Sequence, residues 1–195
     1  AVACCEHLAS KQQEMVQGGA AWVTRAGAAI PGMSHGASGI AVALLRVRRL
    51  TGDDRFLNVI LRALDFESSV FDQSANNWPV SFQPNETFAY PVQWCHGAAG
   101  IGLARLEAQS QGLPVDADID AAVQSTLDAP PLQNDDLCCG NFGRVEFLLA
   151  AGLQKNDDSL IRRSHELAQS IVARAATLGG FGLRSGDSFE NPGFH

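Results

Sequence analysis

The sequence predicts an all-α protein, and three of its features lead to that prediction. A short glycine motif occurs three times, as GMSHGASGI at 32–40, WCHGAAGI at 94–101 and LCCGNFG at 137–143. Apolar residues at helical spacing follow every copy, and no alternation of apolar and polar residues predicts a competing strand. The copies are separated by roughly 40–60 residues, which is the length of a helical-hairpin repeat. We therefore expect a series of helical hairpins, each opened by a glycine motif.

The first element expected is a helix over residues 4–17, where Ala, Glu, Gln and Leu are mixed without a helix breaker. This helix contains Cys4 and Cys5. No glycine turn follows these cysteines, and a free cysteine generally behaves as a small buried hydrophobe. We therefore interpret both as packing residues rather than ligands.

The first hairpin is expected to begin at Gly36. Apolar residues recur at helical spacing over 40–50. Asp53 or Asp54 can then cap the returning helix, whose apolar residues continue over 57–64.

A long aromatic loop, 70–93, precedes the second hairpin, which is expected over 97–111 and 118–127. The aromatic residues of the loop are Trp78, Phe82, Phe88 and Tyr90. Long loops inside compact domains are often functional, and this one leads directly to the second motif. It can therefore form a wall of the site or be a surface connection with buried aromatics, and the sequence favours neither.

The third hairpin is expected to contain a helix that starts after Gly140 and ends near Gly152. Asp157 or Ser159 then starts a long returning helix that continues through Leu178.

Length and composition are those of one globular domain, with 195 residues of which 46% are hydrophobic and 18% charged. The chain has no initiator methionine and ends on NPGFH at 191–195, which has the form of a further motif. We therefore expect residues 1–195 to be a partial domain, truncated at both ends.

Charge and cysteine content exclude several functional classes. The formal net charge of −7 argues against nucleic acid as a partner, because phosphate binding requires clustered Lys and Arg. No apolar run approaches the roughly 20 residues of a membrane span. Five cysteines are an odd number, which argues against a fully disulfide-paired secreted protein. Reduced thiols in a cytoplasmic enzyme are the better interpretation.

Cysteines precede the glycine of the second and third motifs. Cys95, Cys138 and Cys139 would each stand at the start of a helix, and repeated hairpins would bring them, with His35 of the first motif, to one end of a barrel of helices. Three cysteine thiolates form a zinc ligand set with one open coordination position. An open position is typical of catalytic zinc, because structural sites usually have four protein ligands. The cysteines therefore predict a Zn²⁺ site.

HGASGI, WCHGAAGI and LCCGNFG closely resemble the motifs of lanthionine synthetase C-like cyclases, in particular the C-terminal cyclase domain of class II lanthipeptide synthetases. The resemblance extends over essentially the whole chain. It implies an α/α toroid, a double ring of helical hairpins with zinc at its central mouth, which would be incomplete here. It also implies that Cys95, Cys138 and Cys139 are the zinc ligands and that His35 is the active-site histidine.

Two positions depart from the family pattern. Many members have histidine as the third ligand, where this chain has Cys139, a pattern found in a subset of the class II enzymes. Some members have arginine four residues before the first ligand, where this chain has Pro91. The acidic partner of the active-site histidine comes, in the family, from an earlier repeat outside this chain.

The resemblance implies a zinc-dependent peptide cyclase. A cysteine thiol of a dehydrated precursor peptide would add to dehydroalanine or dehydrobutyrine and form a lanthionine or methyllanthionine ring. His35 would exchange the protons of this addition, because histidine titrates near neutral pH, and His96 would orient the site. The implied partners are the precursor peptide and a dehydratase domain fused upstream.

Two other functions are compatible with the same residues. A structural zinc module would close the site with a fourth protein ligand such as His96 or His35. A catalytically silent protein of the same fold would hold peptides as a scaffold. The presence of His35 together with all three cysteines argues against the silent scaffold.

Overall fold

The computed structural model describes residues 2–25, 27–81 and 89–183, and within them the fold is helical, as the sequence predicts. The elements are α1 (Val2–Lys11), β1 (Gln13–Glu14), β2 (Ala20–Ala21), α2 (Ala37–Thr51), η1 (a 3-10 helix, Asp54–Phe56), α3 (Leu57–Ser69), α4 (Ala98–Gln109), α5 (Asp116–Asp128), α6 (Asn141–Lys155) and α7 (Asp158–Leu178). The two strands are only two residues long, so the all-α class is confirmed.

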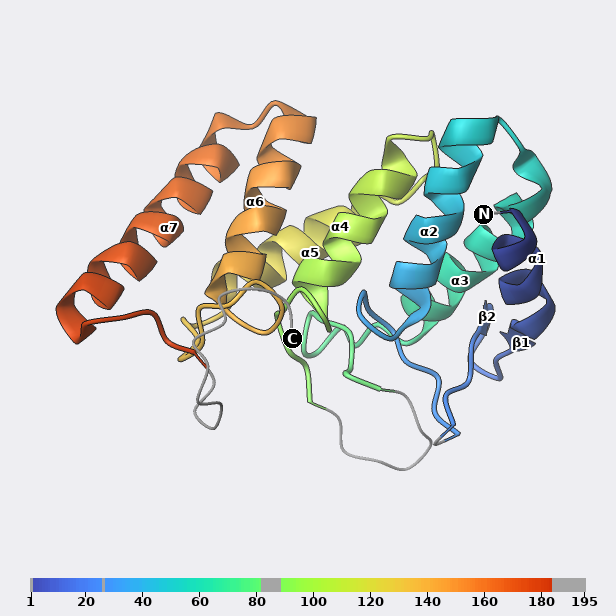
Figure 1. The fold of residues 1–195 in the computed structure, drawn as a ribbon, viewed down its shortest axis with the longest axis horizontal. Helices are drawn as coiled ribbons and strands as arrows, with labels where there is room; N and C mark the ends of the chain where they lie inside the picture. Colours follow the sequence, from blue (N-terminus) through green and yellow to red (C-terminus); the bar gives the residue numbers. More distant parts are fainter. Residues whose placement is uncertain (1, 26, 82–88, 184–195) are drawn as a thin grey trace.

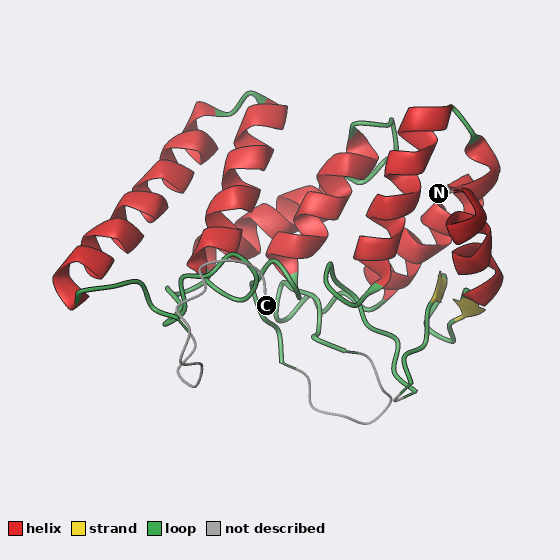
Figure 2. Cartoon of the chain, in the orientation of Figure 1, coloured by secondary structure: helices red, strands yellow, loops and turns green. Residues whose placement is uncertain are grey.

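Six of the helices form three hairpins, α2–α3, α4–α5 and α6–α7, which follow one another along the molecule (Figure 1). Helix α4 lies between α2 and α6 and contacts both. The turns within the hairpins lie along one edge, and the loops that lead into α2, α4 and α6 lie along the opposite edge (Figures 1 and 2). This is the arrangement expected of consecutive hairpins in an α/α toroid, and it places the three glycine motifs on one edge.

The N-terminal helix is shorter than the sequence predicts. Helix α1 ends at Lys11, and β1 and β2 pair in antiparallel fashion after it. The side-chain amide of Gln12 donates hydrogen bonds to the carbonyl oxygens of Ala20 and Val59, at 3.3 and 2.8 Å. These long-range bonds direct the chain back towards α3, and they override the local helix propensity of residues 12–17.

The prediction that both N-terminal cysteines are packing residues is correct for one of them. Cys5 is buried in the hydrophobic core, whereas Cys4 is exposed. Helix α1 contributes only Cys5 to the fully buried residues. Neighbouring residues of a helix point in different directions, so only one of the two can face the core.

Two aspartates cap helices where the sequence predicts helix starts. The Asp53 carboxylate accepts a hydrogen bond from the backbone N–H of Arg55 at 2.9 Å, at the start of η1. The Asp157 carboxylate accepts from the N–H groups of Ser159 and Leu160, at 2.8 and 3.3 Å, at the start of α7. Both satisfy N–H groups that have no partner within the helix.

Helix α6 continues beyond Gly152, where the sequence predicts its end. It ends instead at Lys155, and Asn156 follows in the left-handed conformation that asparagine tolerates, with φ of 52°. A Cβ atom at Gly152 would lie 2.8 Å from Cγ1 and 2.9 Å from the backbone nitrogen of Ile161. This glycine therefore lets α7 approach α6 closely and does not terminate the helix.

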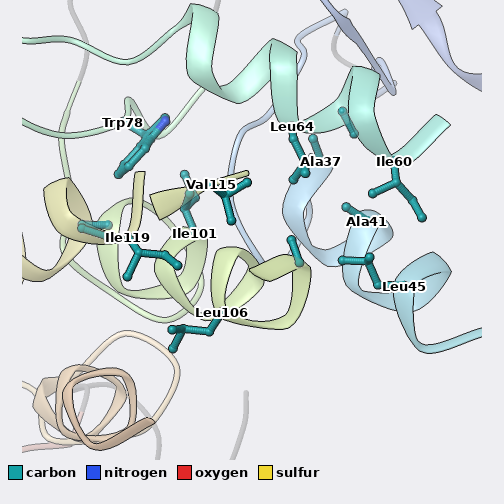
Figure 3. Packing of buried hydrophobic residues seen from close by; sticks show 14 of the residues in the cluster. Ala37, Ala41, Leu45, Ile60, Leu64, Trp78, Ile101, Leu106, Val115 and Ile119 are labelled. Carbon is teal, nitrogen blue, oxygen red and sulfur yellow. The ribbon is translucent and has the colours of Figure 1, made fainter. Parts of the chain in front are cut away.

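The core is formed between the hairpins, as Figure 3 shows for residues of α2, α3, α4 and α5. Short side chains of α2, such as Ala37 and Ala41, lie in the same cluster as Ile60 and Leu64 of α3. Apolar burial of this kind is the main favourable contribution to folding. It fixes the helix starts relative to one another and so positions the motif loops.

No helix in the described part of the chain is both long and apolar enough to cross a membrane. The NPGFH segment, interpreted above as the start of a further motif, lies outside the described residues.

Candidate metal centre

The three cysteines predicted as ligands come together at the starts of α4 and α6. The Sγ atoms of Cys95, Cys138 and Cys139 all lie within 4.8 Å of one another. The Cys95–Cys139 distance is 3.3 Å and the Cys138–Cys139 distance is 3.6 Å. Sulfur atoms bound about 2.3 Å from a tetrahedral metal ion would be separated by about 3.8 Å. The spacing of the three thiols therefore fits a common metal ion.

Close glycine contacts fold each motif loop over the first turn of its helix. Each motif has a second glycine, three residues after the first, and a Cβ atom at that position would collide with the carbonyl oxygen of a residue six positions earlier. The colliding pairs are Gly39 with Met33, Gly100 with Trp94 and Gly143 with Leu137. Only glycine permits this approach, and the glycine spacing is the sequence signal that shows the three loops to be equivalent.

Main-chain hydrogen bonds join the three motif loops through Cys95. The N–H of Cys95 donates to the carbonyl oxygen of Cys138 at 3.1 Å. The carbonyl oxygen of Cys95 accepts from the N–H groups of Met33 and Ser34, both at 3.1 Å. Gly97, which follows, has φ of 78°, a conformation that glycine adopts readily. The middle loop is therefore fixed to both neighbours by peptide groups.

Burial makes the metal-free thiols poor acids. It is the main cause that raises the pKa of the Cys95 thiol, and the hydrogen bond with Cys139 adds to the effect. Burial, again with a contribution from Cys139, raises the pKa of Cys138 to about 11. A nearby cation would favour the thiolate forms. The donor set is that of a metal which prefers soft sulfur ligands.

The two predicted histidines lie near each other and outside the thiol cluster. The ring centroids of His35 and His96 are 6.4 Å apart, and neither imidazole belongs to the potential ligand group found among the described residues. His35 is exposed, whereas His96 is half-buried. Burial lowers the pKa of His96, the nearby His35 adds to this, and a hydrogen bond to the backbone of Pro31 opposes it.

A buried ion pair that no sequence motif indicates lies beneath the His35 loop. Glu67 of α3 and Arg105 of α4 are both inaccessible to solvent, and Arg105 Nη1 donates to Glu67 Oε2 at 2.8 Å. Arg105 Nε also donates to Asp118 of α5 at 2.7 Å. Burial alone would lower the pKa of Arg105, but the two carboxylates outweigh it and raise the pKa. Nothing in the local sequence marks these positions, because single charged residues usually lie on a solvated helix face.

Other buried polar side chains hold the loop that carries Cys138 and Cys139. Asn141 Nδ2 donates to the carbonyl oxygens of Leu132 and Asn134 and to the Asp135 carboxylate, each at 2.9 Å. The Asp135 carboxylate also forms an ion pair with Arg174 of α7. The first turn of α6 therefore secures the loop that precedes it.

Arg144, also in the first turn of α6, reaches two loops. It is buried, and it donates from Nε to the carbonyl oxygen of Val92 at 2.7 Å and from Nη1 to that of Pro130 at 2.6 Å. No carboxylate in the described part of the chain forms an ion pair with it, and burial lowers its pKa. Arg144 thus connects the segment before Cys95 to the segment before Cys138.

In the aromatic loop, Trp78 contributes to packing rather than to the thiol cluster. Trp78 is fully buried, and its indole N–H donates to the carbonyl oxygen of Glu67 at 2.9 Å. Phe82 and Phe88 lie outside the described residues. Trp78 therefore supports the interpretation of this loop as a connection with buried aromatics.

Comparisons with known proteins agree with this geometry. The family model described as "Lanthionine synthetase C-like protein" matches residues 4–194. One similar protein is the lacticin 481/lactococcin biosynthesis protein LcnDR2 of Lactococcus lactis subsp. lactis, which is 32% identical over 78 residues. That match covers 40% of this chain but only 8% of the relative. Because the family model covers nearly the entire chain and three equivalent glycine loops bring the thiols together, the chain belongs to the lanthionine synthetase C-like family.

Proposed function

We propose that the chain forms the cyclase site of a lanthipeptide synthetase, which closes thioether rings in a dehydrated precursor peptide. The observation that carries the proposal is the convergence of three thiols, without a histidine, in a member of the lanthionine synthetase C-like family. Three protein ligands would leave one tetrahedral position for a cysteine of the peptide.

Cys95, Cys138 and Cys139 would hold Zn²⁺. When bound, zinc lowers the pKa of a thiol at its open position, so that the thiol is deprotonated at neutral pH. The three protein thiolates outnumber the two positive charges of the ion. A sulfur-rich donor set of this kind would leave a substrate sulfur nucleophilic, because little positive charge remains to hold it.

His35 would handle the protons of the reaction. A new bond forms between the substrate sulfur and the β-carbon of dehydroalanine or dehydrobutyrine, and the electrons of the double bond move toward the neighbouring carbonyl group, which becomes an enolate. The α-carbon must then receive a proton, which His35 would supply as a general acid. Its exposed ring can reach a bound peptide, and an imidazole near neutral pH exchanges protons readily.

His96 would serve a different purpose. Burial lowers its pKa, so a neutral ring is favoured, and its Nδ1 atom is buried without a hydrogen-bond partner among the described residues. We assign His96 the role of orienting the site beside Cys95. As a proton carrier it ranks second to His35.

The substrate defines the other partners. The alkene of dehydroalanine or dehydrobutyrine arises by removal of water from Ser or Thr, so a dehydratase must act before the cyclase. We propose that this dehydratase is fused upstream in the full-length protein and that the reaction takes place in the cytoplasm, where cysteine thiols stay reduced.

The test is to purify the full-length protein, measure bound zinc, and add a peptide that contains one dehydroalanine and one cysteine. We expect one zinc per protein, and loss of the free peptide thiol without change of mass as the ring closes. X-ray absorption of the protein without peptide should show three protein sulfur ligands and one exchangeable ligand. A fourth protein ligand would indicate a structural zinc module, and full zinc occupancy without ring closure would indicate a silent scaffold.

A further inference from the structure

One carboxylate oxygen lies beneath the His35 loop and accepts hydrogen bonds from both of its ends. Glu67 Oε1 accepts from the N–H of Gly32 and from the N–H of Ser38, each at 2.9 Å. The Ser38 hydroxyl donates to both carboxylate oxygens, at 2.8 and 2.7 Å. His35 lies midway between Gly32 and Ser38, so the two N–H bonds close a short loop with His35 at its tip.

Glu67 also replaces a missing helix cap. Gly36 is the N-cap residue of α2 and has no side chain to accept from the first turn. Ser38 is the second residue of that helix, and its N–H would otherwise lack an intrahelical partner. The Glu67 carboxylate reaches it from α3 and adds a negative charge where the α2 dipole is positive.

The position of Glu67 is itself fixed. Its Oε2 atom accepts from Arg105 Nη1 at 2.8 Å, and the pair is inaccessible to solvent. The carbonyl oxygen of Glu67 accepts from the buried Trp78 indole. Hydrogen bonds to a buried, charged acceptor are about twice as strong as neutral ones. Neither Glu67 nor Arg105 belongs to the thiol cluster.

We propose that Glu67 is a positioning residue for His35, which sets where the imidazole stands relative to the bound peptide. This inference rests on the proposed cyclase function. It assigns no proton transfer to Glu67, which acts only by holding Gly32 and Ser38. The metal ligands belong to other loops, so loss of Glu67 should affect proton delivery and leave zinc binding unchanged.

A matched pair of double variants separates this role from the ion pair. Glu67→Gln/Arg105→Met and Glu67→Met/Arg105→Met both remove the buried charges, which apolar replacement often tolerates. Glutamine keeps a carbonyl oxygen for the two N–H groups, whereas methionine offers no acceptor. The difference between the variants therefore reports the acceptor alone.

Three quantities are measured in the full-length protein: hydrogen exchange of the Gly32 and Ser38 amides, bound zinc and steady-state cyclisation. The methionine variant should exchange these amides roughly 10- to 100-fold faster than the glutamine variant, in proportion to the loss of two hydrogen bonds. Its kcat should be lower than that of the glutamine variant by a similar factor, with KM within about 2-fold and zinc content unchanged in both. Ser38→Ala leaves the ion pair and both N–H bonds intact but removes the hydroxyl bonds that help to hold the Glu67 carboxylate. It should therefore accelerate exchange by a smaller factor.

Equal exchange in the glutamine and methionine variants would overturn the inference, because the loop would then not depend on Glu67. Faster exchange with unchanged kcat would overturn it as well. If both double variants fail to fold, unchanged exchange in Ser38→Ala decides against it. Absence of ring closure in the unmodified protein would instead refute the proposed function, and the exchange comparison would still decide whether Glu67 holds the loop.

Discussion

The loop that carries His35 and the loop that carries Cys138 and Cys139 have the same backbone motif but are held by opposite charges. Beneath the first, the Glu67 carboxylate of α3 accepts from backbone N–H groups. Beneath the second, the side chains of α6 donate to backbone carbonyl groups, as Arg144 does to Pro130. The acceptor beneath the first loop comes from the returning helix of the same hairpin, whereas the donors beneath the second loop come from the helix that the loop opens. Equivalent loops can therefore be fixed by unrelated contacts.

This difference predicts that proton delivery and metal binding can be impaired separately. The largest effect is expected for His35→Asn, which removes the imidazole and leaves the metal-binding loops intact. Cyclisation of a dehydrated peptide should slow by about 10²–10⁴-fold, the usual contribution of general acid–base catalysis, with zinc content unchanged. His165→Asn on the exposed face of α7 is the matched control and should have no effect. Zinc loss in His35→Asn would make His35 a ligand and remove the distinction between the loops.

Cys139→Ala tests the other loop. It removes one of three proposed ligands and should lower zinc affinity by about 10²–10³-fold, more than loss of a group that only supports a ligand. Hydrogen exchange of the Gly32 and Ser38 amides should not change, since their acceptor is Glu67. The measurement is zinc competition with a chelator, and the exposed Cys4→Ala provides the control. Undiminished affinity in Cys139→Ala would show that Cys139 is only a neighbour of the metal.

Arg144→Met tests whether the side chains of α6 position the cysteines. It leaves the carbonyl oxygens of Val92 and Pro130 without their buried donor, which should cost about 2–4 kcal/mol of unfolding free energy. Zinc affinity should fall by about 10- to 100-fold, as for other groups that orient ligands. Denaturant unfolding and zinc competition measure the two effects, with the exposed Arg162→Met as control. A loss of stability without a change in affinity would restrict Arg144 to a structural role.

The smallest effect is expected for Cys139→His. Imidazole is also a good zinc ligand, so zinc should remain bound at full stoichiometry. Neutral imidazole donates less negative charge than thiolate, and single-turnover cyclisation should slow by about 10-fold or less. A rate equal to that of the unmodified protein would mean that the third thiolate does not tune the substrate sulfur.

The sequence predicts the helical hairpins and the meeting of the cysteines well, because both depend on periodic and repeated local patterns. Apolar spacing identifies α2 to α7, and the repeated glycine motif places Cys95 beside Cys138 and Cys139. The end of α1 is predicted less well, since long-range bonds of Gln12 decide it. Local propensity cannot anticipate a partner from another element.

The contacts that hold the loops could not be predicted from the sequence. Glu67 lies within a helix whose exposed positions also carry charged residues, and its partner Arg105 is 38 positions away along the chain. Among the described residues, Arg144 donates to the carbonyl groups of Val92 and Pro130, and such groups leave no mark in the sequence of the loops. A buried charge is recognisable only after the fold shows what surrounds it.

The main-chain hydrogen bonds that join the loops through Cys95 have a consequence for how such a site can evolve. Because main-chain atoms make these contacts, they are indifferent to which side chain projects from the same position. Ser34, Cys95 and Cys138 are equivalent positions, each two residues before the motif glycine, yet only the latter two carry a thiol. A backbone frame of this kind allows serine, cysteine and histidine to replace one another at fixed positions during evolution. New ligand sets can then arise by single substitutions while the frame itself is retained.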